Sequence, residues 1–212
     1  MRPALLLASR NPNKLRELRR ALPGWEIELL TAESEPVEDG QTFLENARIK
    51  ARHGRRHAAP EDWVAGEDSG IEVAALGGRP GIESARWASG PVERLLTELA
   101  GVEDRSARYV CELVVLAPDG SELRATGTLD GAIALEPRGS EGFGYDPVFV
   151  PLGEIETVAA LGDAWKSEHS HRVRAAAALA AALARRGDAS IRVKPPSASP
   201  PACERASGRG SA

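Results

Sequence analysis

The chain has 212 residues, of which 42% are hydrophobic, so it can bury one substantial core or two small lobes around a cleft. Its 27 Lys and Arg residues against 31 Asp and Glu residues give a formal net charge of −4, which argues against a broad face for nucleic-acid polymers and allows a local basic pocket for a small anion. The two cysteines, Cys111 and Cys203, support neither a disulfide framework nor a zinc cluster, and a reducing cytoplasm fits best.

Apolar runs alternate with segments of helical periodicity along the chain, which predicts an α/β fold. In chain order we expect a strand at 5–8, a helix at 15–22, a strand at 25–30, a helix at 42–59, strands at 63–65 and 71–76, and a helix at 91–100. A β-hairpin at 107–116 and 123–129 follows, then strands at 131–135 and 148–150 and an alanine-rich helix at 170–186. Glycine-rich turns are expected at 66–70 and 77–81, and a glycine-rich loop at 139–151.

The sequence predicts neither a signal peptide nor a membrane span. The apolar run at 4–8 is too short for a signal-peptide core, and no stretch approaches the roughly 20 residues that a membrane span needs. Residues 193–212 are rich in Pro, Ser, Gly and Ala, so they cannot bury enough apolar surface to offset their ordering entropy. We therefore expect a soluble domain over 1–187 and a disordered tail over 188–212.

The segment after the first predicted strand carries polar groups suited to a phosphate, namely Ser9, Arg10, Asn11, Pro12, Asn13 and Lys14. A parallel sheet binds ligands at the carboxyl ends of its strands, where a helix N-terminus presents free N–H groups and a positive dipole end. The same segment would also serve as a simple helix cap with a surface lysine. A second ammonium group, Lys50 in the predicted helix 42–59, would suit a triphosphate, although a surface lysine has the same pattern.

Acidic residues follow the predicted strand 63–65. Asp68 stands in the run Glu67-Asp68-Ser69-Gly70, and Glu38 lies in the loop before the predicted helix 42–59. Adjacent carboxylates repel each other unless a cation lies among them. Mg²⁺ typically takes one or two protein carboxylates and completes its shell with phosphates and water. The pattern therefore suggests a magnesium site, and the simpler alternative is that Asp68 and Ser69 cap a turn.

The string from Gly142 to Pro147 combines glycines with aromatic side chains and a carboxylate, in Phe143, Gly144, Tyr145 and Asp146. The glycines allow the backbone to approach a flat ligand, and an aromatic ring can stack on a base. A β-turn with its aromatic rings in the core is the alternative. Lys166 and the pair His171-Arg172 stand before and at the start of the alanine-rich helix, where they are either donors to a ligand or ordinary surface residues.

Together these motifs resemble the inosine triphosphate pyrophosphatase family, which hydrolyses non-standard purine nucleoside triphosphates. They occur in the family's order, over about residues 3–186: ASRNPNK at 8–14, TFLENARIKA at 42–51, EDSG at 67–70, LGGRPGIESAR at 76–86, GFGYDP at 142–147 and SHR at 170–172. The resemblance implies a two-lobed α/β fold around a long central mixed sheet, with the nucleotide in a cleft between the lobes, and usually a homodimer.

The resemblance also implies the roles of individual residues. Residues 9–14 and Lys50 would hold the triphosphate, Glu38 and Asp68 would bind Mg²⁺, and Asp68 would also accept the proton of the attacking water. The nucleotide pocket would comprise Ser69, Phe143, Gly144, Tyr145, Asp146, Lys166, His171 and Arg172. The expected reaction releases a nucleoside monophosphate and pyrophosphate from ITP, dITP or XTP. Base selection is expected from His171 and Arg172 with Phe143 and Asp146, because donors suit the 6-oxo group of these purines and not the amino group of adenine.

The chain departs from the family pattern at two places within the domain. Position 67 is Glu where the family typically has Asp, which bears on metal geometry, and residues 153–164 lack the usual acidic helix start. A related family of nucleotide pyrophosphatases, named for septum-formation inhibition, shares the first phosphate loop and prefers modified pyrimidine nucleotides; residues 142–147 and 170–172 argue against it. A nucleotide sensor without catalysis is the second alternative, and the pair Glu67-Asp68 argues against that.

Overall fold

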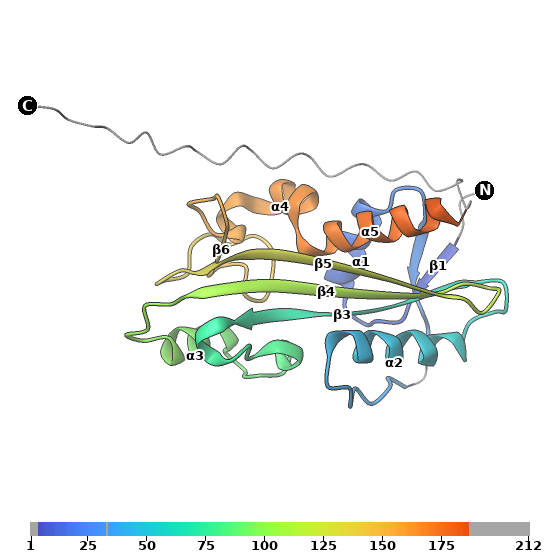
Figure 1. Cartoon of the computed structure of the whole chain (residues 1–212), viewed down its shortest axis with the longest axis horizontal. Helices are drawn as coiled ribbons and strands as arrows, with labels where there is room; N and C mark the ends of the chain where they lie inside the picture. Colours follow the sequence, from blue (N-terminus) through green and yellow to red (C-terminus); the bar gives the residue numbers. More distant parts are fainter. Residues whose placement is uncertain (1–3, 33, 187–212) are drawn as a thin grey trace, which may run out of the picture.

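The computed structural model describes residues 4–32 and 34–186, which form one mixed sheet with helices on both faces (Figure 1). The strands are β1 (Ala4–Leu7), β2 (Glu26–Leu29), β3 (Trp63–Val73), β4 (Ser106–Leu116), β5 (Glu122–Ile133) and β6 (Phe149–Pro151). Their order in the sheet is β2-β1-β3-β4-β5-β6. β1 pairs in parallel with β2 and β3, and the remaining pairs are antiparallel. The expected α/β fold with a long mixed sheet is confirmed.

The helices are α1 (Pro12–Ala21), α2 (Phe43–Arg55), α3 (Pro91–Glu98), α4 (Val158–His169) and α5 (His171–Arg185). Four of them start at a capping side chain that accepts a backbone N–H: Asn11, Thr42, Thr157 and Ser170. α2 and α3 lie on one face of the sheet, and α4 and α5 lie on the other, where α1 packs against both (Figure 1). Within the described part of the chain, no helix is both long and apolar enough to cross a membrane.

Two hydrophobic clusters fill the two halves of the molecule. The first joins β1, α1 and α5 through residues such as Leu7, Leu18 and Leu179. The second surrounds Leu95 and Phe149 and contains the ends of β3, β4 and β5. These two large clusters are joined by one sheet, and a third, small cluster of Ala47, Ala51 and Val114 lies between α2 and β4.

β3 is longer than the sequence suggested. It runs without interruption from Trp63 to Val73, and the expected turn at 66–70 is wrong. The two glycines of this segment are needed for close packing: a Cβ at Gly66 would lie 2.0 Å from the carbonyl oxygen of Ala47, and one at Gly70 would lie 2.5 Å from that of Gly81. Glu67 and Asp68 therefore lie inside a buried strand and not at the end of one.

Other boundaries also differ. α4 was not expected, because Gly162, with φ 85°, divides it into two short helical halves whose apolar periodicity is weak. Residues 131–133 continue β5, so no separate strand forms at 131–135. α2 ends at Arg55, four residues before the expected end. The predicted tail at 188–212 lies outside the described residues, as does Gly187.

We predict that Gly66→Ala and Gly127→Ala each lower the free energy of unfolding by about 1–3 kcal/mol, because each added methyl group would overlap a helix backbone. A Cβ at Gly66 meets α2, and one at Gly127 lies 2.1 Å from the carbonyl oxygen of His171 in α5. Chemical denaturation measures the effect. Gly90→Ala is the matched control, since its nearest neighbour is the flexible end of Glu93. Equal stability of all three variants and the wild type would contradict the prediction.

Candidate active site

A cavity of about 700 Å³ lies between the two lobes and collects nearly all of the predicted site residues. Of the 17 predicted residues only Asn13 is not part of its lining; its backbone N–H instead donates to the cap Asn11 Oδ1 at 2.9 Å. Six segments of the chain that are distant in sequence thus meet at one place. Their predicted roles in binding and catalysis remain predictions, but the fold puts them within reach of a single ligand.

The loop between β1 and α1 is ordered by its own hydrogen bonds. Ser9 Oγ accepts the backbone N–H of Asn11 at 3.1 Å, and Asn11 Oδ1 accepts those of Asn13 and Lys14 at 2.9 and 3.4 Å. Asn11 is therefore a helix cap as well as a cavity residue. The cap fixes the first turn of α1, and this turn carries the Lys14 side chain into the cavity.

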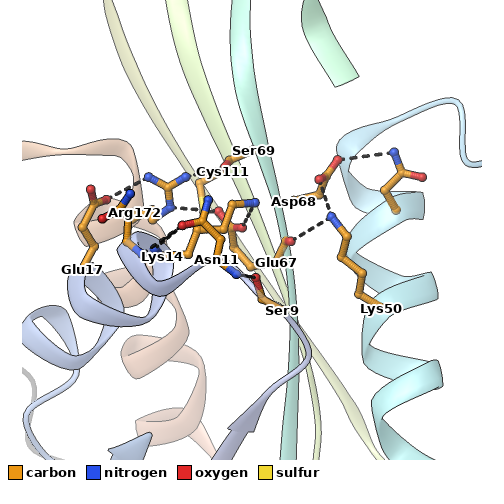
Figure 2. A network of polar contacts seen from close by, with 12 residues as sticks. Ser9, Asn11, Lys14, Glu17, Lys50, Glu67, Asp68, Ser69, Cys111 and Arg172 are labelled. Atoms are coloured by element: carbon orange, nitrogen blue, oxygen red, sulfur yellow. Dashed lines mark hydrogen bonds and ion pairs between the residues drawn. The ribbon is translucent and has the colours of Figure 1, made fainter. Parts of the chain in front are cut away.

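The side chains of Glu67 and Asp68 point to opposite faces of the sheet, because successive residues of a strand alternate. Glu67 is opposite Leu113 of β4, which packs in the cluster of α1 and α5, whereas Asp68 is opposite Glu112. Figure 2 shows the consequence: Asp68 meets Lys50 of α2, and Glu67 meets Lys14 and Arg172. The expected repulsion within an acidic pair is thus replaced by two separately compensated charges.

On the α2 side, one ammonium group joins two carboxylates. Lys50 Nζ lies 2.7 Å from Asp68 Oδ1 and 2.8 Å from Glu38 Oε2. Asn46 Nδ2 also donates to Asp68 Oδ2, at 3.4 Å. Burial raises the pKa of Asp68 above its ordinary value and outweighs the opposing effect of Lys50. Burial alone would lower the pKa of Lys50, but the Asp68 and Glu38 carboxylates raise it overall.

On the other side of β3, Arg172 is held by three partners. Its Nε donates to Glu67 Oε1 at 3.0 Å, its Nη1 to Glu17 Oε2 at 2.8 Å and its Nη2 to Ser69 Oγ at 2.6 Å. Lys166 Nζ lies 2.9 Å from Glu17 Oε1 and 2.5 Å from Asp146 Oδ2. Two cations of the cavity wall therefore share the Glu17 carboxylate, and their side chains cannot move independently.

The far end of the cavity is aromatic. The ring of His171 stacks on Tyr109, with centroids 4.6 Å apart and an interplanar angle of 8°. The Lys166 ammonium lies 4.0 Å from the centre of the Phe143 ring. Asp146 orders this end, because it accepts the Phe143 backbone N–H at 2.7 Å and the Tyr109 hydroxyl at 3.2 Å. A flat ligand placed here would meet aromatic faces and several cationic donors.

Known proteins resemble this chain in both sequence and fold. The model of the Ham1 family matches residues 5–182. The chain belongs to the Ham1 family. It is 45% identical over 195 residues to a protein of Mycobacterium tuberculosis named dITP/XTP pyrophosphatase, covering 84% of this chain and 94% of that protein. A protein of Gloeobacter violaceus with the same name is 41% identical over 176 residues, or 81% and 89% of the two chains. The solved Staphylococcus aureus Ham1 protein superposes with a TM-score of 0.77 at 34% identity, covering 86% of this chain and 99% of that one.

Sequence reasoning missed three residues of this Ham1 site. Glu17 lies three residues after Lys14 in α1, on the same helix face, and this spacing could have identified it. Tyr109 lies in a β4 run in which most residues are apolar, so its sequence gives no sign that its ring lines the cavity. Glu67 was considered as half of an acidic pair beside a metal, whereas the structure pairs its side chain with Lys14 and Arg172.

We predict that His171 stays neutral at pH 6. Burial and the nearby positive charges of Arg172 and Lys166 lower its pKa well below the ordinary 6.5. With a lowered pKa, the neutral ring favours folding above pH 6.5, and this contribution is lost as the pH falls through the folded-state pKa. NMR titration of the imidazole signals tests this, with the His171→Gln spectrum as the control that assigns the resonance. A His171 signal titrating near pH 6.5 would contradict the prediction.

Proposed function

We propose that this protein hydrolyses dITP, XTP and ITP to the nucleoside monophosphate and pyrophosphate, and so removes these nucleotides from the cellular pool. The observation that carries the proposal is one cavity lined both by two lysines, Lys14 in the first turn of α1 and Lys50 of α2, and by an aromatic, donor-rich pocket. This arrangement matches the two parts of a purine nucleoside triphosphate. Relatives that are 40–45% identical to this protein over most of the chain are named dITP/XTP pyrophosphatase.

The phosphate end supports a role for Mg²⁺. The Glu38 and Asp68 carboxylates already share one cation, the Lys50 ammonium, so their positions suit a second cation that brings further ligands. Among the residues that the structure describes, no group of three His, Cys, Asp or Glu side chains could hold a metal, and phosphate oxygens and water would complete the shell. When bound, Mg²⁺ supplies charge neutralisation at the pyrophosphate leaving group.

The protein's own residues then account for the rest of the reaction. Lys14 and Lys50 provide fixed positive charge along the triphosphate, and the ordered first turn of α1 offers backbone N–H groups. Water attacks the α-phosphorus, a new P–O bond forms, and the bond to the bridging oxygen of pyrophosphate breaks. Asp68 accepts the water's proton, a role that its raised pKa supports, because a carboxylate is a better base when its conjugate acid is weaker.

The base end supports selection of 6-oxo purines. Arg172 has five N–H bonds, and its three nitrogens each direct one of them to a protein acceptor. Two N–H bonds remain, so Arg172 can still donate to a purine oxygen while three protein acceptors hold it. Adenine would present an amino group to these donors, and each mismatch costs roughly 1–3 kcal/mol. Phe143 would stack on the base beside Lys166.

We predict pyrophosphate release from dITP and XTP with Mg²⁺, and much slower release from dATP and dTTP. Asp68→Asn should lower kcat by about 10²–10⁴-fold, because the water loses its proton acceptor. Coupled assays for pyrophosphate and orthophosphate measure this, with the exposed Asp130→Asn as the control. Binding of dITP without turnover would favour a sensor, and preference for dTTP would favour a pyrimidine-nucleotide enzyme.

We also propose that the protein is a cytoplasmic homodimer. The buried free thiol of Cys111 suits a reducing compartment. Three exposed large apolar side chains, Leu135, Leu152 and Ile155, lie in the segments that follow β5 and β6 at one edge of the sheet. Each is more than 80% exposed, which favours a protein partner at this edge.

We predict that the paired change Leu152→Glu with Ile155→Glu converts the dimer into a monomer, because two buried charges would cost more than the apolar contact provides. Light scattering after size-exclusion chromatography measures the mass. Val37→Glu is the control, since Val37 is 79% exposed and precedes α2. A wild-type monomer, or a dimer that survives the paired change, would contradict the proposed dimer contact at this edge of the sheet.

A further inference from the structure

Glu67 lies at the centre of the polar network on the α1 and α5 side of the sheet (Figure 2). Its side chain is completely buried, and its two oxygens have different partners. Oε1 accepts from Arg172 Nε at 3.0 Å and from the Cys111 thiol at 3.5 Å. Oε2 lies 2.5 Å from Lys14 Nζ. A buried carboxylate is costly unless it is compensated, so these contacts indicate a specific role.

The two cations on Glu67 come from two different helices. Lys14 follows the phosphate loop on α1, whereas Arg172 stands at the start of α5 with its guanidinium 5.4 Å from the Phe143 ring. Like charges repel, and the Glu67 carboxylate between them is what allows both to be buried in one wall. Arg172 continues the chain of charges through Glu17 to Lys166.

The two contacts of Glu67 differ in kind. Arg172 is a planar guanidinium held by three acceptors, whereas Lys14 Nζ is an ammonium at the end of a flexible side chain, 2.5 Å from Glu67 Oε2. Lys14 is thus the partner that can turn toward a phosphate at little geometric cost. When it does, the Glu67 charge is left to Arg172, which becomes more firmly held.

We propose that Glu67 is a positioning residue that couples triphosphate recognition by Lys14 to base recognition by Arg172. The proposal rests on the proposed function, since it assumes that the phosphates lie at Lys14 and the base lies near Phe143. Through Glu67, binding of the triphosphate fixes the guanidinium, so the penalty for a wrong base is greatest when a full triphosphate is present.

A double-mutant cycle tests the coupling. kcat/KM for dITP is measured for the wild type, Lys14→Met, Arg172→Lys and the double variant. If the two residues acted independently, the loss of kcat/KM in the double variant would equal the product of the two single losses. We expect the measured loss to differ from that product by roughly tenfold, in either direction, which is within the range for residues that share a partner. In a Glu67→Gln background the same cycle should be additive within about twofold. Additive effects in the wild-type background would overturn the proposal.

Base selectivity gives a second readout that a purely structural role would not change. Glu67→Gln should lower the ratio of kcat/KM for dITP over dATP by roughly tenfold. Glu67→Asp keeps the charge but is one methylene shorter, so it should restore only part of the ratio. Glu72→Gln is the matched control on the same strand, because Glu72 pairs with Arg108 on the exposed side at 2.6 Å. An unchanged ratio in a folded Glu67→Gln protein would overturn the proposal.

The outcomes separate the two proposals. Thermal unfolding and circular dichroism show whether the Glu67→Gln protein folds. If it does not fold, the double-mutant cycle of Lys14→Met and Arg172→Lys in the wild-type background decides whether the two residues are coupled. If the wild type binds dITP without hydrolysing it, the proposed function is wrong. The same cycle measured on dITP binding by calorimetry then still decides whether Glu67 couples Lys14 to Arg172.

Discussion

The structure depends on the burial of two carboxylates that are neighbours in one strand. Glu67 is completely buried and Asp68 nearly so, and each needs a cation because an uncompensated buried charge costs several kcal/mol. Strand alternation sends them to opposite faces, so the compensating cations must come from two different layers of helices. Lys50 of α2 supplies one, and Lys14 of α1 with Arg172 of α5 supplies the other. The site is thus the point where β3 holds both layers together.

Close approach of the helices makes this compensation possible. Lys50 reaches Asp68 because α2 packs directly on Gly66, and Arg172 reaches Glu67 because α5 packs directly on Gly127. A side chain at either glycine would overlap the helix backbone and move the cation away from its carboxylate. Close packing and charge compensation therefore both require glycine at these two positions. A change at either glycine would disturb the cavity as well as the core.

The parts of the site that were predictable lie where local chemistry is strong. A polar loop after an apolar strand, two lysines and a glycine-aromatic string each have a recognisable pattern. With the other motifs and the family resemblance they predicted 17 site residues, of which 16 line one cavity. Glu17 could have been noted from its spacing to Lys14, but the role of Glu67 arises only when α1, α5 and β3 meet. The run Gly66 to Gly70 has turn composition, yet its two glycines serve close packing within β3. α4 escaped prediction for a similar reason, since Gly162 interrupts its period.

The balance of charge in the cavity explains why a polyanion would bring a cation with it. Four buried or nearly buried cations face five carboxylates, so this wall is not a simple positive patch: Lys14, Lys50, Lys166 and Arg172 stand against Glu17, Glu38, Glu67, Asp68 and Asp146. A free triphosphate would compete with these carboxylates for every cation. Glu38 and Asp68 would hold the proposed Mg²⁺, which would add positive charge and leave Lys50 free to contact phosphate. The monophosphate product carries less charge and would gain less from these cations, so the carboxylates recover their partners and release of the monophosphate is favoured.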